Sequence, residues 1–146
     1  MLLDVAFMVD ANPLPGAAAV ARAAEAIGFA ALWAPETAHN PFLPLTIAAE
    51  HTSCIGLGTA VAIAFPRSPM VTAQIAWDLA AFSQGRFMLG LGTQVRAHIE
   101  RRFSASFDQP VERLRDYILA LRAIWQSFQS NGRLNYRGQF YQHTLM

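Results

Sequence analysis

Hydrophobic residues occur in two kinds of segment along this chain. Short, uninterrupted apolar runs are typical of buried strands, whereas apolar residues three or four positions apart are typical of helices with one buried face. The strand pattern occurs at residues 2–9, 29–34, 55–64 and 86–91. The helix pattern occurs at residues 16–27, 43–52, 69–84 and 110–128. Because the two kinds alternate, we predict an α/β fold in which parallel strands are covered by helices.

Boundary residues support several of these elements. Ser68 followed by Pro69 is a helix-start pair, in which a hydroxyl caps the backbone and proline takes the first helical position. Gly28 and Gly85 stand where a helix commonly ends. Asp108 is expected to cap the helix that begins at Pro110.

The last part of the chain predicts one long helix and a hairpin. Apolar residues at helical spacing define one face of the long helix: Val111, Leu114, Ile118, Leu121, Trp125 and Phe128. Residues 133–144 then alternate around Arg137-Gly138, which predicts a short β-hairpin. The three tryptophans, Trp33, Trp77 and Trp125, are interpreted as core residues.

Composition narrows the class of protein. The chain has 146 residues, of which 53% are hydrophobic and 14% are charged, so it can bury a core. Its net charge of +1 offers no reason to expect a nucleic-acid or membrane partner. Cys54 is the single cysteine, so we expect no internal disulfide. His51 has no other potential metal ligands near it in the sequence, so we expect no metal site. The N-terminus lacks the basic region of a signal peptide, and we expect a cytoplasmic protein.

A glycine phrase occurs twice, as IGLGTAV at residues 55–61 and as LGLGTQV at residues 89–95. A dinucleotide-binding GxGxxG pattern fails in both copies, because its third glycine falls at Val61 and at Val95. The sequence has no lysine, which excludes a P-loop. Bare backbone at two neighbouring strand ends could form one wall of a slot for a planar ring. The alternative is that these glycines only relieve the curvature of the sheet.

Three segments carry a resemblance to a known family: GFAALWAPE (28–36), IGLGTAVAIAFPRSPMVTAQIAWDL (55–79) and SQGRFMLGLGTQ (83–94). They resemble the luciferase-like monooxygenase superfamily, in particular its deazaflavin (coenzyme F-420)-dependent oxidoreductases. The resemblance implies a TIM-type (β/α) barrel with the cofactor at the carboxyl ends of its strands. Such a barrel typically needs about 250 residues. We therefore expect residues 1–146 to form a single domain, an N-terminal half-barrel of about four β/α units plus the hairpin.

The resemblance also implies where the cofactor binds. Relatives have a cis peptide bond, not preceding proline, at the end of the third strand, which forms a bulge behind the deazaflavin ring. The matching position here is Ala60-Val61. The loop Gly92-Thr93-Gln94 is expected to contact the ring edge or side chain. Separately from the resemblance, the basic cluster of Arg96, Arg101 and Arg102 would ordinarily be a solvated face, but beside this loop Arg96 is a candidate to pair with the cofactor's phosphate or acidic tail.

Relatives carry an acid-histidine pair after the second strand. Here Glu36 matches the acid, Thr37 replaces the histidine, and His39 lies two residues further on. Glu36 and His39 are therefore the candidate catalytic residues. The ordinary alternative is a helix-capping or solvated acid beside a surface histidine.

These features predict an oxidoreductase that transfers a hydride between F-420 and a small organic substrate. FMN is the alternative cofactor, which would make the protein a monooxygenase. A second hypothesis is a truncated half-barrel without activity, or an assembly module. The open strand edge of a half-barrel predicts pairing with a second copy or with a missing C-terminal half.

Overall fold

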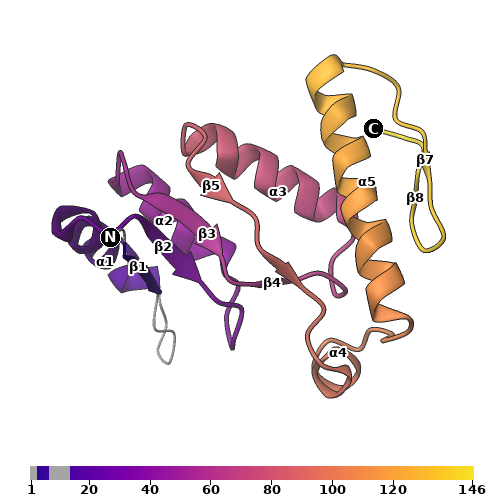
Figure 1. The fold of residues 1–146 in the computed structure, drawn as a ribbon, viewed down its shortest axis with the longest axis horizontal. Coiled ribbons are helices and arrows are strands. Elements are labelled where there is room, and N and C mark those ends of the chain that lie inside the picture. The colour runs from indigo at the N-terminus through magenta and orange to yellow at the C-terminus, as the bar shows by residue number, and fades with distance from the viewer. Residues whose placement is uncertain (1–2, 7–13) are drawn as a thin grey trace. The chain divides into compact units, whose positions relative to one another are not determined.

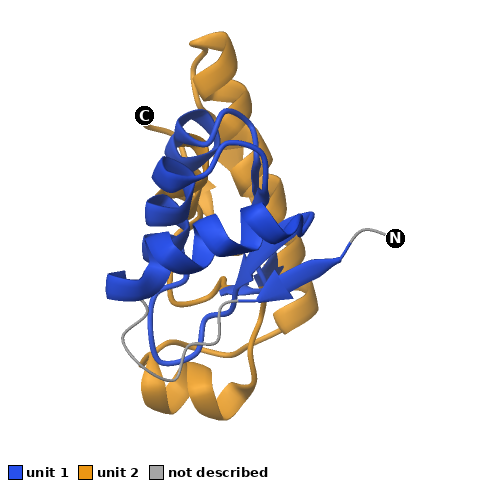
Figure 2. Ribbon diagram, turned by 90° about the vertical axis from the view of Figure 1, so that its left-hand side faces the viewer, with its two compact units in different colours: residues 1–62, 78–91 blue, residues 63–77, 92–146 orange. Residues whose placement is uncertain are grey.

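The computed structural model describes residues 3–6 and 14–146, which form alternating strands and helices (Figure 1). The strands are β1 (Asp4–Ala6), β2 (Ala31–Ala34), β3 (Gly56–Thr59), β4 (Ala62–Ile63), β5 (Phe87–Met88), β6 (Leu91–Gly92), β7 (Tyr136–Arg137) and β8 (Gln142–His143). The helices are α1 (Leu14–Ile27), α2 (Phe42–His51), α3 (Pro69–Phe82), α4 (Arg96–Arg102) and α5 (Pro110–Ser130). Figure 2 shows two compact units, residues 1–62 with 78–91 and residues 63–77 with 92–146. That residues 1–146 form a single domain stays a prediction.

The first unit contains a parallel four-stranded sheet in the order β1-β2-β3-β5, which confirms the predicted α/β class. Trp33 of β2 pairs with Gly58 of β3, and Gly58 pairs with Met88 of β5. Leu32 and Leu57 are fully buried in the middle of the sheet. The predicted first strand covers residues 2–9, of which Leu2 and residues 7–9 lie outside the described residues.

Two predicted strands are each split in the structure. The segment 55–64 forms β3 and β4, and the segment 86–91 forms β5 and the start of β6. Before the break the strand bonds to both neighbours, since the Leu57 N–H donates to the Arg86 carbonyl and the Ala60 N–H donates to the Ala34 carbonyl of β2. After the break the Ala62 N–H donates to the Gly90 carbonyl, on the side of β5 and β6. A continuous apolar run indicates burial, but it carries no signal for the point at which pairing with one neighbouring strand ends.

The amino ends of the strands in this unit are held by two charged side chains. Glu25 Oε1 accepts hydrogen bonds from the N–H groups of Ser53, Cys54 and Ile55, at 2.8, 2.6 and 3.0 Å. Arg86 donates to four backbone carbonyl groups, those of Ala49, Thr52, Ile55 and Ser83, and to the Thr52 hydroxyl. Together they bind backbone groups at the end of α2, in the turn before β3 and, at Ser83, directly after α3.

The Glu25 carboxylate makes stability depend on pH. Burial raises its pKa, but the N–H donors of Cys54, Ile55 and Ser53 and the charge of Arg86 outweigh burial, so the pKa is lowered overall. A carboxyl with a lowered folded-state pKa stabilises the protein above its unfolded pKa, and this stabilisation is lost as the pH falls through the folded pKa. We expect Glu25→Gln to unfold at lower urea concentration at pH 7 and to lose part of the acid sensitivity of the wild type.

The matched control is Glu50→Gln, which removes an exposed acid from α2. Urea denaturation from pH 7 to pH 3 measures the free energy of unfolding of each variant. An unchanged pH profile in Glu25→Gln would contradict the assigned role of this carboxylate.

The second unit is organised around α5. Its N-cap residue is Gln109, in a left-handed conformation and without a side-chain capping bond, so the predicted Asp108 cap is wrong. Pro110 at the first turn already supplies the helix start. The Ser68 cap of α3 is confirmed, because its hydroxyl oxygen accepts from the Val71 N–H at 3.3 Å.

The buried face of α5 differs from the predicted apolar face. Its buried residues are Asp116, Tyr117, Ala120, Leu121, Ile124 and Ser127. Leu121 was predicted correctly, whereas Val111 is 74% exposed. The spacing of the largest apolar residues therefore misplaced the face by about one helical position, because Tyr117 and a carboxylate occupy the core side.

A buried acid explains this shift. Asp116 accepts from the Tyr136 hydroxyl at Oδ1 and from the N–H groups of Phe140 and Tyr141 at Oδ2, the latter two at 2.6 and 3.1 Å. The predicted hairpin is confirmed, with β7 and β8 antiparallel and Tyr136 opposite His143. Because a Cβ on Gly138 would overlap Asp116 Oδ1, only glycine fits the turn at that position.

Candidate functional site

The structure joins two of the predicted site segments at the carboxyl ends of adjacent strands in the first unit. The Glu36 N–H donates to the Val61 carbonyl at 3.3 Å, and the Ala60 N–H donates to the Ala34 carbonyl at 3.0 Å. The loop after β2 and the segment after β3 are thereby linked through their backbones. The peptide bond between Ala60 and Val61 is cis, at the position the resemblance implied.

Ala60 and Val61 form a small apolar surface at this strand end. Both are exposed, whereas Thr59 before them and Ala62 after them are almost fully buried. The Val61 side chain is 43% exposed. Parallel sheets place ligands at the carboxyl ends of their strands, so exposed apolar groups here are a candidate contact surface for a ring.

The two candidate catalytic residues lie in the loop beside this surface. Glu36 is 8% exposed, and His39 is exposed. The end of the loop is anchored because Asn40 Oδ1 accepts from the Phe42 N–H at 2.9 Å, which starts α2. The backbone of Glu36 therefore lies beside that of Val61. Catalytic roles for Glu36 and His39 stay predictions.

The interpretation that the glycines leave room for a planar ring is wrong for three of them. A Cβ on Gly58 would overlap the Trp33 ring, and a Cβ on Gly90 would overlap the Thr59 carbonyl oxygen. At Gly56 a Cβ would come within 3.1 Å of the Met88 methyl carbon. These positions are bare because protein atoms already occupy the space that a side chain would need.

Thr59 is a structural residue that the sequence interpretation missed. Its hydroxyl donates to the Gly90 carbonyl at 2.7 Å and accepts from the Gly90 N–H at 2.9 Å. The glycine at position 90 lets the two backbones approach closely enough for this pair of bonds. The repeated GxGT phrase contained the signal, since a hydroxyl residue directly follows the glycine pair.

The other predicted cofactor residues lie in the second unit, in the segment that leads into α4. Gly92 accepts at its carbonyl from the Ala64 N–H at 3.0 Å. The Thr93 hydroxyl donates to the Gln94 carbonyl at 3.1 Å, and Gln94 has a positive φ of 58°. Contact of Gly92, Thr93 and Gln94 with a cofactor stays a prediction.

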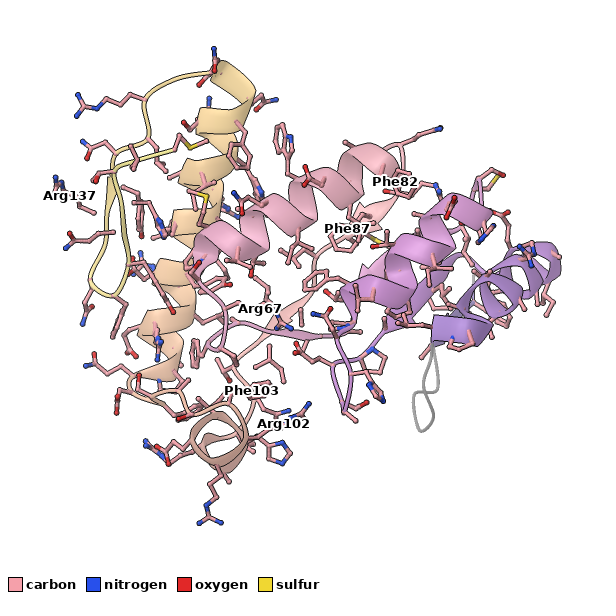
Figure 3. All side chains as sticks on the ribbon, turned by 180° about the vertical axis from the view of Figure 1, so that it is seen from behind. Arg67, Phe82, Phe87, Arg102, Phe103 and Arg137 are labelled. Carbon is pink, nitrogen blue, oxygen red and sulfur yellow. The ribbon has the colours of Figure 1, made fainter. Side chains whose placement is uncertain are left out.

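Arg96 begins α4, a helix that the sequence analysis did not predict. Its guanidinium pairs with Glu100 at 2.7 Å and lies over the Phe107 ring at 5.2 Å. On the same helix Arg102 lies over the ring of Phe103, at 4.7 Å (Figure 3). Arg96 thus already has an acidic and an aromatic partner, and pairing with a cofactor phosphate would have to compete with Glu100.

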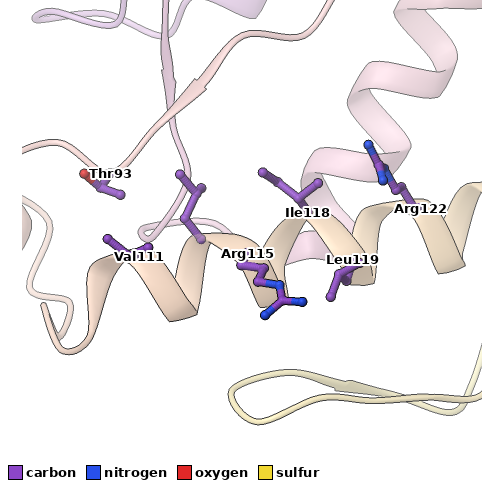
Figure 4. A pocket seen from close by; sticks show the side chains of 7 residues that line it. Thr93, Val111, Arg115, Ile118, Leu119 and Arg122 are labelled. Atoms are coloured by element: carbon purple, nitrogen blue, oxygen red, sulfur yellow. The ribbon is translucent and has the colours of Figure 1, made fainter.

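Along α5 the second unit has an open groove of about 440 Å³ (Figure 4). Its lining residues are Thr93, Val111, Leu114, Arg115, Ile118, Leu119 and Arg122. Three of these residues, Val111, Leu114 and Ile118, belong to the predicted apolar face, and the lining also contains two arginines and no acid. Among residues 3–6 and 14–146, no three His, Cys, Asp or Glu side chains gather as a metal site would require. No helix in these ranges is long and apolar enough to cross a bilayer.

Comparison with known proteins gives a family match over nearly the whole chain. Residues 4–146 match the family described as luciferase-like monooxygenase. An uncharacterized protein of Mycobacterium tuberculosis is 50% identical over 135 residues, which are 92% of this chain and 40% of the relative. The chain thus spans about 40% of the length of this relative and of two further mycobacterial relatives that are equally similar.

Solved structures share the fold. The coenzyme F-420-dependent tetrahydromethanopterin reductase of Methanopyrus kandleri superposes with a TM-score of 0.76 at 21% identity, covering 97% of this chain and 44% of the reductase. The oxygenating constituent of the 3,6-diketocamphane monooxygenase of Pseudomonas putida, in complex with FMN, gives a TM-score of 0.84 at 16% identity, with 99% and 44% covered. The chain therefore has the fold of part of a barrel that serves both cofactors in other proteins.

Proposed function

Because the chain belongs to the luciferase-like monooxygenase family, we propose that it takes part in hydride transfer between F-420 and a small organic substrate. The observation that carries the proposal is the hydrogen bond from the Glu36 N–H to the Val61 carbonyl. It links the predicted acid and the predicted ring-contacting segment within one unit. Exposed apolar surface and an ionisable side chain at one strand end are the two features that such a site needs.

The residues present fit a flat, largely apolar ring. The exposed Ala60 and Val61 side chains carry no polar atom, so they can lie against a ring face without losing hydrogen bonds to water. Glu36 lies beside them with most of its surface buried, and His39 lies in the same loop. The fit rests on this apolar surface and not on the glycines.

In the proposed site F-420 supplies the hydride acceptor or donor, and the protein supplies position and proton handling. Ala60 and Val61 support one face of the ring. Glu36 and His39 hold or move a proton beside the reacting atoms, which is general acid–base work by side chains of the kind that commonly perform it. Glu36 is little exposed, so water competes weakly for this contact.

FMN is the second candidate cofactor, and the fold shared with the FMN-bound monooxygenase favours it. An isoalloxazine ring has the same three-ring outline, so the Ala60-Val61 surface accommodates either. The other alternative, an assembly module without activity, is favoured by the apolar groove on α5, where Val111 is 74% exposed.

Titration of the 146-residue chain with oxidised F-420 and with FMN, followed by difference absorbance, tests the proposal. We expect saturable binding with F-420 preferred at least tenfold over FMN. Glu36→Gln and His39→Gln should weaken F-420 binding about threefold to tenfold, because both side chains lie beside the ring. The matched control Glu50→Gln, an exposed acid on α2, should bind like the wild type.

Each other outcome decides between the alternatives. Preferential binding of FMN would replace the F-420 proposal by the monooxygenase alternative. No binding of either cofactor by a folded chain would leave the assembly module as the remaining hypothesis.

A further inference from the structure

One face of β3 carries no side chains in its middle. Side chains alternate along a strand, so Gly56 and Gly58 lie on one face and Leu57 on the other. Leu57 pairs in register with Phe87 of β5, whose ring packs against Phe42 of α2, so Leu57 and its buried neighbour Leu32 on β2 lie on the face covered by α2. The glycines therefore lie on the opposite face of the sheet.

Large side chains from the two neighbouring strands cover this bare backbone. Trp33 of β2 pairs in register with Gly58, and its ring occupies the space that a Cβ on Gly58 would take. Met88 of β5 covers Gly56 in the same way, with its methyl carbon 3.1 Å from where a Cβ would lie. The Trp33 ring packs on β3 at Gly58. Trp33 is nevertheless only half-buried, so part of the residue stays accessible. The sequence interpretation of Trp33 as an ordinary core residue is therefore incomplete.

Trp33 lies on the same face of the sheet as Ala60 of the proposed cofactor surface. Ala60 still pairs with β2 through its N–H and the Ala34 carbonyl, so the alternation of faces continues from Gly58 to Ala60. Two residues along a strand correspond to about 7 Å. A ring system that lies on Ala60 therefore ends against the indole of Trp33, on the same face of the sheet.

We propose that Trp33 is a positioning residue that forms the inner boundary of the cofactor site, with Gly58 holding its ring flat across β3. The inference rests on the proposed function, because it assumes an aromatic cofactor on Ala60 and Val61. Aromatic rings in contact are stabilised beyond the area that they bury, which favours planar ligands at this position. Gly58 contributes by having no side chain that would lift the indole toward the cofactor.

The test compares cofactor affinity and tryptophan fluorescence in the 146-residue chain titrated with oxidised F-420. We expect Trp33→Ala to bind at least tenfold more weakly than the wild type and Trp33→Phe to recover to within about threefold, since it restores an aromatic face. A chain with Trp77→Phe and Trp125→Phe keeps Trp33 alone. Its emission should fall more strongly on F-420 binding than the emission of Trp33→Phe, which keeps only the other two. A purely structural role for Trp33 would not produce this quenching.

Gly58→Ala supplies a second variant. In the wild-type background the added methyl group displaces the indole, and binding should weaken at least tenfold. In the Trp33→Ala background the methyl group has room, so Gly58→Ala should cause little further loss, and the two effects should not add. Urea denaturation of each variant separates loss of binding from loss of folding.

The outcomes distinguish the inference from the proposed function. If the wild type binds F-420 or FMN and Trp33→Ala binds equally well, the inference is overturned and the proposed function stands. If the folded wild type binds neither cofactor, the proposed function fails and the inference falls with it.

Discussion

Asp116→Ala should destabilise the protein by about 3 kcal/mol or more, because it removes a buried carboxylate that accepts from three donors. Those donors are the Tyr136 hydroxyl and the N–H groups of Phe140 and Tyr141. Asp116 is 7% exposed, so water cannot readily replace the lost acceptor. We expect the hairpin formed by β7 and β8 to detach from α5 before the rest of the second unit unfolds. Urea denaturation measures the loss of stability, and hydrogen exchange of the Phe140 and Tyr141 amides locates it.

Tyr136 gives a local readout of the same substitution. Burial, the hydrogen bond to Asp116 and the charge of Asp116 together raise the pKa of the Tyr136 phenol to about 12. In Asp116→Ala that pKa should fall toward the ordinary value of 10. The matched control is Asp108→Ala, which removes an exposed acid just before the same helix and should change stability by less than about 0.5 kcal/mol. Equal losses in the two variants would contradict the anchoring role of Asp116.

The fold class could be predicted because it follows from repeated local patterns. Apolar runs such as residues 29–34 and the helical spacing of residues 16–27 each occur next to turn residues, and together they specify parallel strands with crossovers. The split of residues 55–64 could not be predicted from this pattern. It depends on the tertiary pairing at Ala60, where the bonds to β2 end while bonds on the side of β5 and β6 resume at Ala62, and the apolar run does not encode that pairing.

The candidate site, like the fold, could be predicted from the sequence only in part. The resemblance named Glu36 and Ala60-Val61, and in the structure a backbone hydrogen bond joins Glu36 to Val61, while contact of these residues with a cofactor stays a prediction. Reasoning from glycine alone failed, because a missing side chain does not say what fills the space. At Gly58 the ring of Trp33, from the neighbouring strand β2, fills the space. Trp33 can be identified as the residue that does so only when the register of β2 on β3 is known.

The central claim is that the exposed Ala60-Val61 segment supports the ring of a redox cofactor, and Val61→Asp tests it most directly. Val61 is 43% exposed, so an aspartate there stays hydrated in the free protein and should fold normally. A bound ring would bury that carboxylate against an apolar face, at a cost of several kcal/mol that the protein can avoid only by not binding. Val71→Asp is the matched control, because it changes a valine of α3 that is 45% exposed.

The decisive measurement is the dissociation constant of oxidised F-420 for the wild type, Val61→Asp and Val71→Asp. We expect Val61→Asp to bind at least a hundredfold more weakly than the wild type, while Val71→Asp binds equally well. Undiminished binding of F-420 to a folded Val61→Asp chain would contradict the account, since the ring would then lie somewhere other than on Ala60 and Val61.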